Sequence, residues 1–184
     1  KQLKDVETSK TELESLIADL IKDIKQRFTE SFDDINHHFG MLFSEIFGGG
    51  EARLQLSDPD DVLNSDVEIY AAPPGKVIKS LSLLSGGEKS MVALTIYLAI
   101  LLHRPTPFCM LDEVDAALDE ANVQKYATYL KRFSHNTQLM VITHRRGTIE
   151  LCDVLYGVYM QEKGVSGLLR QEFSEEFLNE VENA

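Results

Sequence analysis

"FCMLDEVDAALD", residues 108–119, decides the fold class of this chain. An apolar run ends in Asp112 and Glu113, and an amphipathic stretch follows at residues 120–134, which is the pattern of a short buried strand and then a helix. A second apolar run, "TQLMVIT" at residues 137–143, predicts another buried strand. Strands and helices that alternate at these lengths predict an α/β layer with parallel strands.

The carboxylates that end the first predicted strand are candidates for nucleotide chemistry. Ligands bind at the carboxyl edge of a parallel sheet, and a carboxylate there, such as Asp112, can hold Mg²⁺ directly or through water. The next one, Glu113, can polarise an attacking water near a γ-phosphate. Acidic residues are also common turn formers at strand ends. Asp115 and Asp119 favour a site, because four carboxylates within eight residues repel one another unless a cation or a partner's donors offset them.

A second stretch, "LLSGGEKS" at residues 83–90, stands directly before a long apolar helix predicted from Gly86 to about His103. Ser85 and Glu88 form a capping-box pattern that would satisfy the helix start by itself. Capping alone does not account for two successive glycines, which cost roughly 1 kcal/mol each against alanine in a helix. We therefore favour a site where an anion approaches the bare backbone at the helix N-terminus.

A third stretch, "VITHRRGT" at residues 141–148, places His144 after the second predicted strand. If the two strands are neighbours, His144 lies at the edge that carries Asp112 and Glu113, where it could hydrogen-bond a γ-phosphate or the attacking water. A lone histidine is more often structural or solvated. No phosphate loop of the form G-x-x-x-x-G-K-[ST] occurs in the 184 residues.

The N-terminal part of the chain has a different pattern. Apolar residues follow alternating three- and four-residue steps up to Ile24, with Lys10 as the polar exception, and thus predict a coiled-coil seam: Leu3, Val6, Leu13, Ile17, Leu20 and Ile24. The steps then lengthen, as expected where a coil docks onto a globular body. An ordinary amphipathic bundle helix is the alternative. "GGG" at 48–50 ends the helix.

We predict three segments: a coiled-coil arm at residues 1–47, a globular lobe at 48–173 and a weakly ordered acidic tail at 174–184. In the lobe, "EARLQLS" and "DVEIYAAPP" predict two antiparallel strands, "EANVQKYATYLKRFS" a helix capped by Asp119, "RGTIELC" a short helix, and "VLYGVYMQ" and "VSGLLRQEF" two final strands.

Composition limits the function classes. The net charge of −12 disfavours adhesion of the whole surface to DNA but permits a local basic strip. The two cysteines, Cys109 and Cys152, match no metal-ligand spacing and predict free buried thiols in a reducing compartment. The longest apolar stretch, Met91–Leu102, is too short to span a bilayer. We expect a cytoplasmic protein without membrane contact, and a piece of a longer chain.

Taken in order, "LSGGEKS", "FCMLDEVDAALD" and "VITHRRG" resemble the ATP-binding-cassette (ABC) ATPases. The surrounding text, including "FGGGEARLQL", "PPGKVIKSLSLLSGGEKS" and "ITHRRGTIELCDVLYGVYMQEKGVS", resembles the carboxy-terminal half of the head of bacterial SMC (structural maintenance of chromosomes, condensin-type) proteins, from roughly Phe28 to Phe173. The resemblance implies an ABC-type head lobe, mainly parallel sheet flanked by helices, with an N-terminal coiled-coil arm. The amino-terminal half of the same protein would supply the Walker A loop that is missing here.

The resemblance also implies a catalytic set. Asp112 would be the Walker B ligand of Mg²⁺ and Glu113 the residue that orients the hydrolytic water. His144 would be the switch histidine. Two small departures, Ser90 where many relatives have alanine and "HRRG" for the commoner "HRKG", touch no proposed ligand.

The remaining site residues would act across a dimer. Ser85, Gly86 and Gly87 would be the signature motif, which closes over ATP bound on a second head, and Asp119 would lie in the D-loop. The implied cofactors are ATP and Mg²⁺. The implied partners are the amino-terminal half, a second identical head, DNA and a kleisin subunit, whose winged-helix domain is expected on residues 154–173.

Two alternatives remain open from the sequence. One is a DNA-repair ATPase with a coiled-coil arm, which belongs to the same ATPase class. The other is a non-catalytic scaffold, against which the intact Asp112, Glu113 and His144 argue. Under the favoured interpretation, ATP hydrolysis between two engaged heads drives DNA entrapment and chromosome condensation and segregation, and the isolated chain is inactive.

Overall fold

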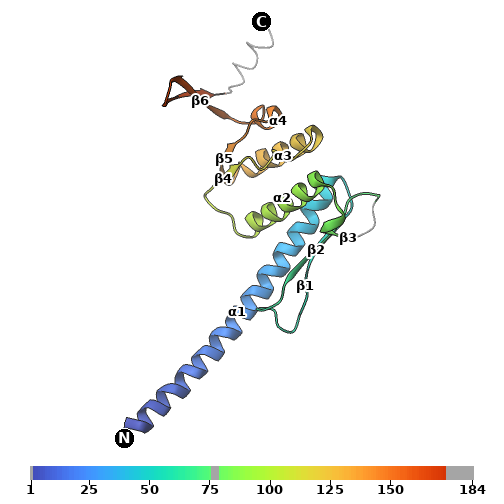
Figure 1. The fold of residues 1–184 in the computed structure, drawn as a ribbon. Coiled ribbons are helices and arrows are strands. Elements are labelled where there is room, and N and C mark those ends of the chain that lie inside the picture. Colours follow the sequence, from blue (N-terminus) through green and yellow to red (C-terminus); the bar gives the residue numbers. More distant parts are fainter. Residues whose placement is uncertain (1, 76–78, 173–184) are drawn as a thin grey trace. The chain divides into compact units, whose positions relative to one another are not determined.

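The computed structural model describes residues 2–75 and 79–172. The chain divides into two compact units, Lys1–Arg104 and Pro105–Ala184, and each is described by itself (Figure 1). The predicted acidic tail at 174–184 lies outside the described residues. No helix in the described ranges is long and apolar enough to cross a membrane.

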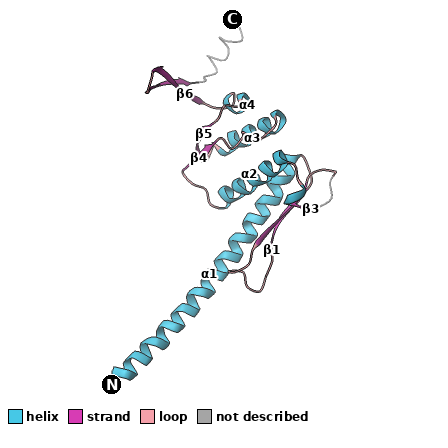
Figure 2. Cartoon of the chain, viewed as in Figure 1, coloured by secondary structure: helices cyan, strands magenta, loops and turns pink. Residues whose placement is uncertain are grey.

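The first unit is built on one long helix. Its elements are α1 (Gln2–Phe47), β1 (Glu51–Leu56), β2 (Val67–Ala72), β3 (Lys79–Ser80), a 3₁₀ turn (Leu81–Leu83) and α2 (Gly86–His103). The three strands form an antiparallel sheet in the order β1-β2-β3 (Figure 2). The predicted bounds of α2 and the pairing of β1 with β2 are confirmed.

Only the last part of α1 is buried. Phe39, Leu42, Phe43 and Ile46 are in the core, where α1 packs against α2 and β1. Gly50 ends this segment with a φ of 88°, and a Cβ at that position would collide with the carbonyl of Ala72. The turn that follows α1 therefore requires glycine at residue 50, because any other residue would be strained there.

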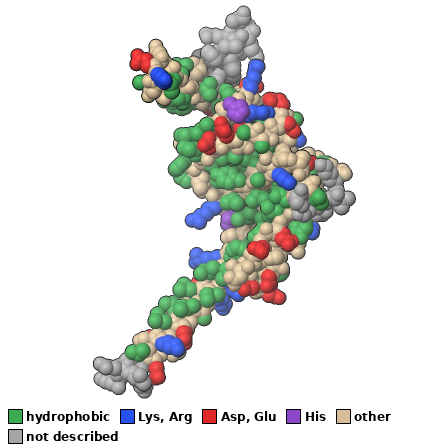
Figure 3. Space-filling model, in the orientation of Figure 1, with side chains coloured by type: hydrophobic (Ala, Val, Ile, Leu, Met, Phe, Trp, Pro, Cys, Tyr) green, Lys and Arg blue, Asp and Glu red, His purple; other side chains and the backbone are tan. Residues whose placement is uncertain are grey.

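The N-terminal part of α1 carries an exposed apolar row. Five members of the predicted seam are 51–67% exposed: Val6, Leu13, Ile17, Leu20 and Ile24. Hydrophobic side chains along this arm are visible in the space-filling view (Figure 3). An apolar row of this length on a single helix is typical of a helix that pairs with another one.

The second unit contains β4 (Phe108–Asp112), α3 (Glu120–Phe133), β5 (Gln138–Ile142), α4 (Arg146–Ile149), β6 (Val154–Glu162) and β7 (Val165–Glu172). β4 and β5 are parallel, whereas β6 and β7 form an antiparallel hairpin. α3 begins at the predicted cap, Asp119, whose carboxylate accepts from the N–H of Asn122 at 2.9 Å. The α/β class is confirmed, with β4–β5 as the parallel pair of the described residues.

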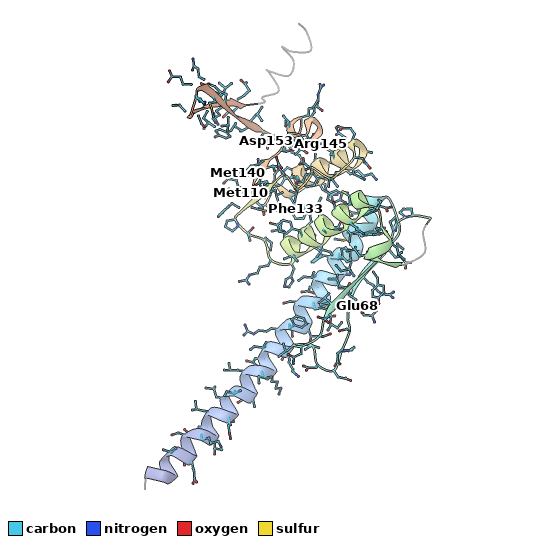
Figure 4. All side chains as sticks on the ribbon, in the orientation of Figure 1. Glu68, Met110, Phe133, Met140, Arg145 and Asp153 are labelled. Atoms are coloured by element: carbon cyan, nitrogen blue, oxygen red, sulfur yellow. The ribbon has the colours of Figure 1, made fainter. Side chains whose placement is uncertain are left out.

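The prediction that β4 and β5 are buried strands is confirmed only in part. Cys109 and Leu111 are buried, but the alternate side chains are 49–66% exposed: Phe108, Met110, Met140 and Ile142. Met110 and Met140 are register partners on the two strands (Figure 4). The apolar runs are present, but one face of the β4–β5 pair is exposed within the described part of its own unit.

Cys109 and Cys152 are not joined in a disulfide, as predicted. Cys109 is buried in β4, and Cys152 is half-buried just after α4. Burial raises the pKa of the Cys152 thiol above its usual range, and the nearby Asp153 carboxylate adds to the shift. The protonated thiol donates to the carbonyl of Thr148 at 3.4 Å. We assign Cys152 a packing role and no reactivity.

Candidate functional site

The parallel pairing of β4 and β5 brings two of the three motifs together. Asp112 is the register partner of Ile142, and the next N–H, that of Glu113, donates to the carbonyl of Ile142 at 2.9 Å. The pairing therefore extends to the point where both strands end. The loops that carry Glu113 and His144 consequently leave the sheet at the same edge, as predicted from the sequence.

Glu113 has an unusual backbone conformation. Its φ is 48°, and among residues 2–75 and 79–172 no other residue except glycine has a positive φ. Such a conformation costs of order 1–3 kcal/mol for a residue with a Cβ, and residues of this kind cluster at functional sites. The turn is closed by the N–H of Ala116, which donates to the Glu113 carbonyl at 3.1 Å. The structure thus holds Glu113 in a strained conformation directly after β4.

His144 faces that carboxylate. Its Nδ1 lies 4.0 Å from Oε1 of Glu113, and the two side chains are 64% and 63% exposed. At this distance and exposure the pair contributes nothing definite to stability. Both groups are free to turn toward a ligand, which suits a water-orienting carboxylate and a γ-phosphate donor better than a structural ion pair.

Asp112 is exposed at the end of β4, directly before Glu113. A single exposed carboxylate fits a hard cation such as Mg²⁺, which keeps several waters and takes further oxygen ligands from substrate phosphates. The residues that the structure describes contain no group of three or more histidine, cysteine or acidic side chains able to hold a metal.

Asp115 differs from what the sequence predicted. It does not crowd the edge with the other carboxylates, because it is turned inward and is only 1% exposed. Its Oδ2 accepts from Oγ1 of Thr143 at 2.7 Å and from Oγ1 of Thr148 at 2.6 Å. Its Oδ1 has no hydrogen-bond partner among the described residues. Two hydroxyl donors therefore offset part of the cost of burying this carboxylate.

Arg145 was not predicted as a site residue from the sequence. Its guanidinium donates to the carbonyl of Leu118 at 2.9 Å and lies 3.4 Å from a carboxylate oxygen of Glu120. These contacts connect the segment after β5 to the predicted D-loop. Asp119 itself is occupied as the cap of α3, with both carboxylate oxygens accepting from Asn122.

The "SGG" stretch belongs to the other unit. Ser85 and Glu88 form the complete capping box: the Ser85 N–H donates to the Glu88 carboxylate at 3.0 Å, and the Glu88 N–H donates to the Ser85 hydroxyl at 3.4 Å. A Cβ on Gly86 would meet nothing within 4 Å. Nothing that the structure describes therefore requires glycine at residue 86.

Comparison with known proteins identifies relatives along nearly the whole chain. Residues 2–167 match the family described as "RecF/RecN/SMC N terminal domain". The chain is 50% identical to "Chromosome partition protein Smc" of Bacillus subtilis over 175 residues, and 49% identical to the protein of that name from Desulfitobacterium hafniense over 168 residues. These matches cover 95% and 91% of this chain but only 15% and 14% of those relatives.

Solved structures agree with the sequence matches. One, "Structural biochemistry of ATP-driven dimerization and DNA stimulated activation of SMC ATPases", has a TM-score of 0.75 at 36% identity and covers 86% of this chain and 97% of its own. Another is a Pyrococcus furiosus "Smc head domain with an extended coiled coil bound to the C-terminal domain of ScpA", with a TM-score of 0.79 at 36% identity, covering 92% of this chain and 42% of its own.

Proposed function

Because the chain belongs to the RecF/RecN/SMC family and has the fold of an SMC ATPase head, we propose that it is the carboxy-terminal half of such a head. Completed by the amino-terminal half and engaged with a second, identical head, it binds and hydrolyses ATP. This cycle drives DNA entrapment and chromosome condensation and segregation in the bacterial cytoplasm, in association with the nucleoid.

The uncovered face of β4–β5 carries this proposal. The parallel strands β4 and β5 end at candidate catalytic residues and expose four large apolar side chains, of which Phe108 is the most exposed. Parallel sheets are normally covered on both faces. Together with the missing phosphate loop, the uncovered face indicates that further strands or helices, with the Walker A loop, complete the sheet.

Within the completed head, each residue at the edge has a distinct task. Bound Mg²⁺ would neutralise phosphate charge, and the Asp112 carboxylate is placed to hold it. Glu113, aimed by its strained backbone, orients and polarises the attacking water. His144 stands beside Glu113 and donates a hydrogen bond to the γ-phosphate or the water.

The signature motif supplies the opposite wall of the site. The capping box leaves N–H groups of the first α2 turn pointing out of the helix, and the open space at Gly86 admits a phosphate of the ATP on the second head. Asp119 lies in the D-loop of the same interface. ATP therefore favours the engaged dimer, because only that state offers both walls.

We expect the isolated chain to bind ATP weakly and to hydrolyse essentially none, since the loop that holds the β- and γ-phosphates is missing. Adding the separately produced amino-terminal half should restore turnover. The measurement is steady-state phosphate release from the chain alone, from the other half alone and from both together. Turnover by the pure chain that Glu113→Gln abolishes would contradict the half-head assignment.

The exposed seam of α1 fits the same proposal. Its five apolar residues would pack against a helix from the amino-terminal half in an antiparallel coiled coil. An ordinary bundle helix would bury its apolar row against its own unit, which α1 does only from Phe39 onward.

The β6–β7 hairpin is a candidate docking surface for the kleisin subunit. Large side chains on both strands are exposed: Tyr156, Val158, Tyr159, Met160, Val165, Leu168 and Leu169. This is more apolar surface than a terminal hairpin needs for solubility. Two solved relatives are heads bound to the C-terminal domain or C-winged helix domain of ScpA.

Leu169→Lys combined with Arg170→Glu should weaken kleisin binding at least about tenfold. The first change places a charge in an apolar contact, and the second reverses the charge of a neighbouring side chain. Leu169 is 64% exposed, and Arg170 donates to the Tyr156 hydroxyl at 3.2 Å on the hairpin surface, so the head should stay folded. The measurement is a binding isotherm with the kleisin winged-helix domain. A matched control, Val67→Lys with Arg53→Glu on β1–β2, should bind normally; unchanged binding of the hairpin variant would move the contact elsewhere.

A DNA-repair ATPase is the second candidate, and the family model alone does not separate it from the first. The high identity to chromosome partition proteins favours the chromosome function. The intact catalytic edge likewise disfavours a scaffold without activity.

A further inference from the structure

We propose that Asp115 is a positioning residue for ATP hydrolysis: through the hydroxyls of Thr143 and Thr148 it holds the segment that carries His144 against the loop that carries Glu113. The inference rests on the proposed function, because it assumes that Glu113 and His144 act in hydrolysis. Asp115 itself touches neither of them and is not assigned to the metal or the nucleotide.

The contacts bracket His144. Thr143 precedes the histidine and donates to Oδ2 of Asp115 at 2.7 Å, while Thr148, four residues after it, donates to the same oxygen at 2.6 Å. Oγ1 of Thr143 in turn accepts from the backbone N–H of Arg145 at 2.9 Å. One carboxylate oxygen thus fixes both ends of a short segment that carries the candidate catalytic side chain.

Close packing restricts the 143–148 segment in addition to those hydrogen bonds. Gly147 approaches α3 so closely that a Cβ would lie 2.7 Å from Nε2 of Gln124 and 3.0 Å from Cγ1 of Val123. Arg145 adds its bond to the Leu118 carbonyl at 2.9 Å. The segment is therefore seated on α3 and the D-loop, and Asp115 fixes it with respect to the turn at Glu113, two residues away along the chain.

The cost of this arrangement argues for a purpose beyond packing. Burying a carboxylate of which one oxygen has no hydrogen-bond partner among the described residues is unfavourable, so packing alone does not account for an acid at this position. Asp115 accepts hydrogen bonds from two hydroxyls, and an apolar residue could not do so. Since the Glu113 and His144 side chains are exposed and 4.0 Å apart, their relative placement depends on how firmly both loops are held.

The test uses the complete protein, with steady-state ATP hydrolysis as the measurement. Asp115→Ala, Thr143→Val and Thr148→Val should each lower kcat about tenfold or more. KM for ATP should change less than about threefold, because the Walker A loop would hold the β- and γ-phosphates and this segment offers ATP only the His144 contact. Asp115→Asn, Thr143→Ser and Thr148→Ser should restore most of kcat, since the acceptor and the hydroxyls remain. Thr95→Val, which removes a buried hydroxyl bonded to the Met91 carbonyl in α2, is the matched control and should hydrolyse normally.

A double-mutant cycle separates positioning from general destabilisation. In a His144→Ala background, Thr143→Val and Asp115→Ala should lower kcat by no more than about twofold further, because their effect passes through the histidine. Equal losses in both backgrounds, or valine variants with unchanged kcat, would overturn the inference. Thr143→Val keeps the test valid if Asp115→Ala fails to fold. Failure of the proposed function would give a different result. The unmodified complete protein would not hydrolyse ATP, or the Glu113→Gln variant would hydrolyse it normally.

Discussion

Glu113→Gln in the complete protein should lower ATP turnover by roughly 100-fold or more, the range for loss of a general base, while ATP remains bound. The amide has the shape of the carboxylate but polarises water poorly, so hydrolysis is lost and binding is kept. The protein should then accumulate as an engaged dimer, which gel filtration with ATP and Mg²⁺ would detect.

The backbone at Glu113 makes this substitution clean. Glutamine meets the same positive φ as glutamate, so the strain at 48° stays and the change is confined to the side-chain head group. Glu150→Gln, which alters an exposed carboxylate paired with Arg146 at 2.7 Å, is the control and should leave turnover unaffected. A Glu113→Gln protein that stays monomeric with ATP would count against the assigned role.

Local sequence signals predicted the elements with clear boundaries. α2 begins and ends where the capping box and the apolar run place it, and α3 begins at Asp119. β3 and the 3₁₀ turn at Leu81–Leu83 were missed, because β3 has only two residues, too few for an alternating strand pattern to appear in "KSLSL". Helix caps are encoded within four residues, whereas a two-residue strand exists only through its pairing with β2.

Burial and long-range contacts were less predictable. The apolar runs of β4 and β5 indicated a buried pair, but a sequence pattern cannot say which chain supplies the cover. Asp115 was grouped with the edge carboxylates because its hydroxyl partners lie 28 and 33 residues away. Only the parallel register of the two strands brings those threonines to it. The juxtaposition of Glu113 and His144 was predicted because it follows from parallel pairing alone.

Ser85→Arg should separate ATP binding from head engagement. The serine hydroxyl and its capping role are lost, and a long cation enters the space left open beside Gly86, where the partner's γ-phosphate would approach. The protein's own Walker A loop and Asp112 are untouched, so the affinity of a single head for ATP should change by less than about twofold. Turnover should fall at least about tenfold, since hydrolysis needs both walls of the site.

A mixing experiment decides whether Ser85 acts on the second head. Ser85→Arg heads and heads defective only in Walker A are each expected to be inactive alone. In a mixed dimer, one site joins the altered signature to the defective loop, while the other joins an intact signature to an intact loop. Partial turnover should therefore return on mixing. A mixture as inactive as either parent would mean that both sites must fire together or that Ser85 acts within its own head. Crosslinking across the interface separates these two, because only the first still forms the mixed dimer with ATP at its intact site.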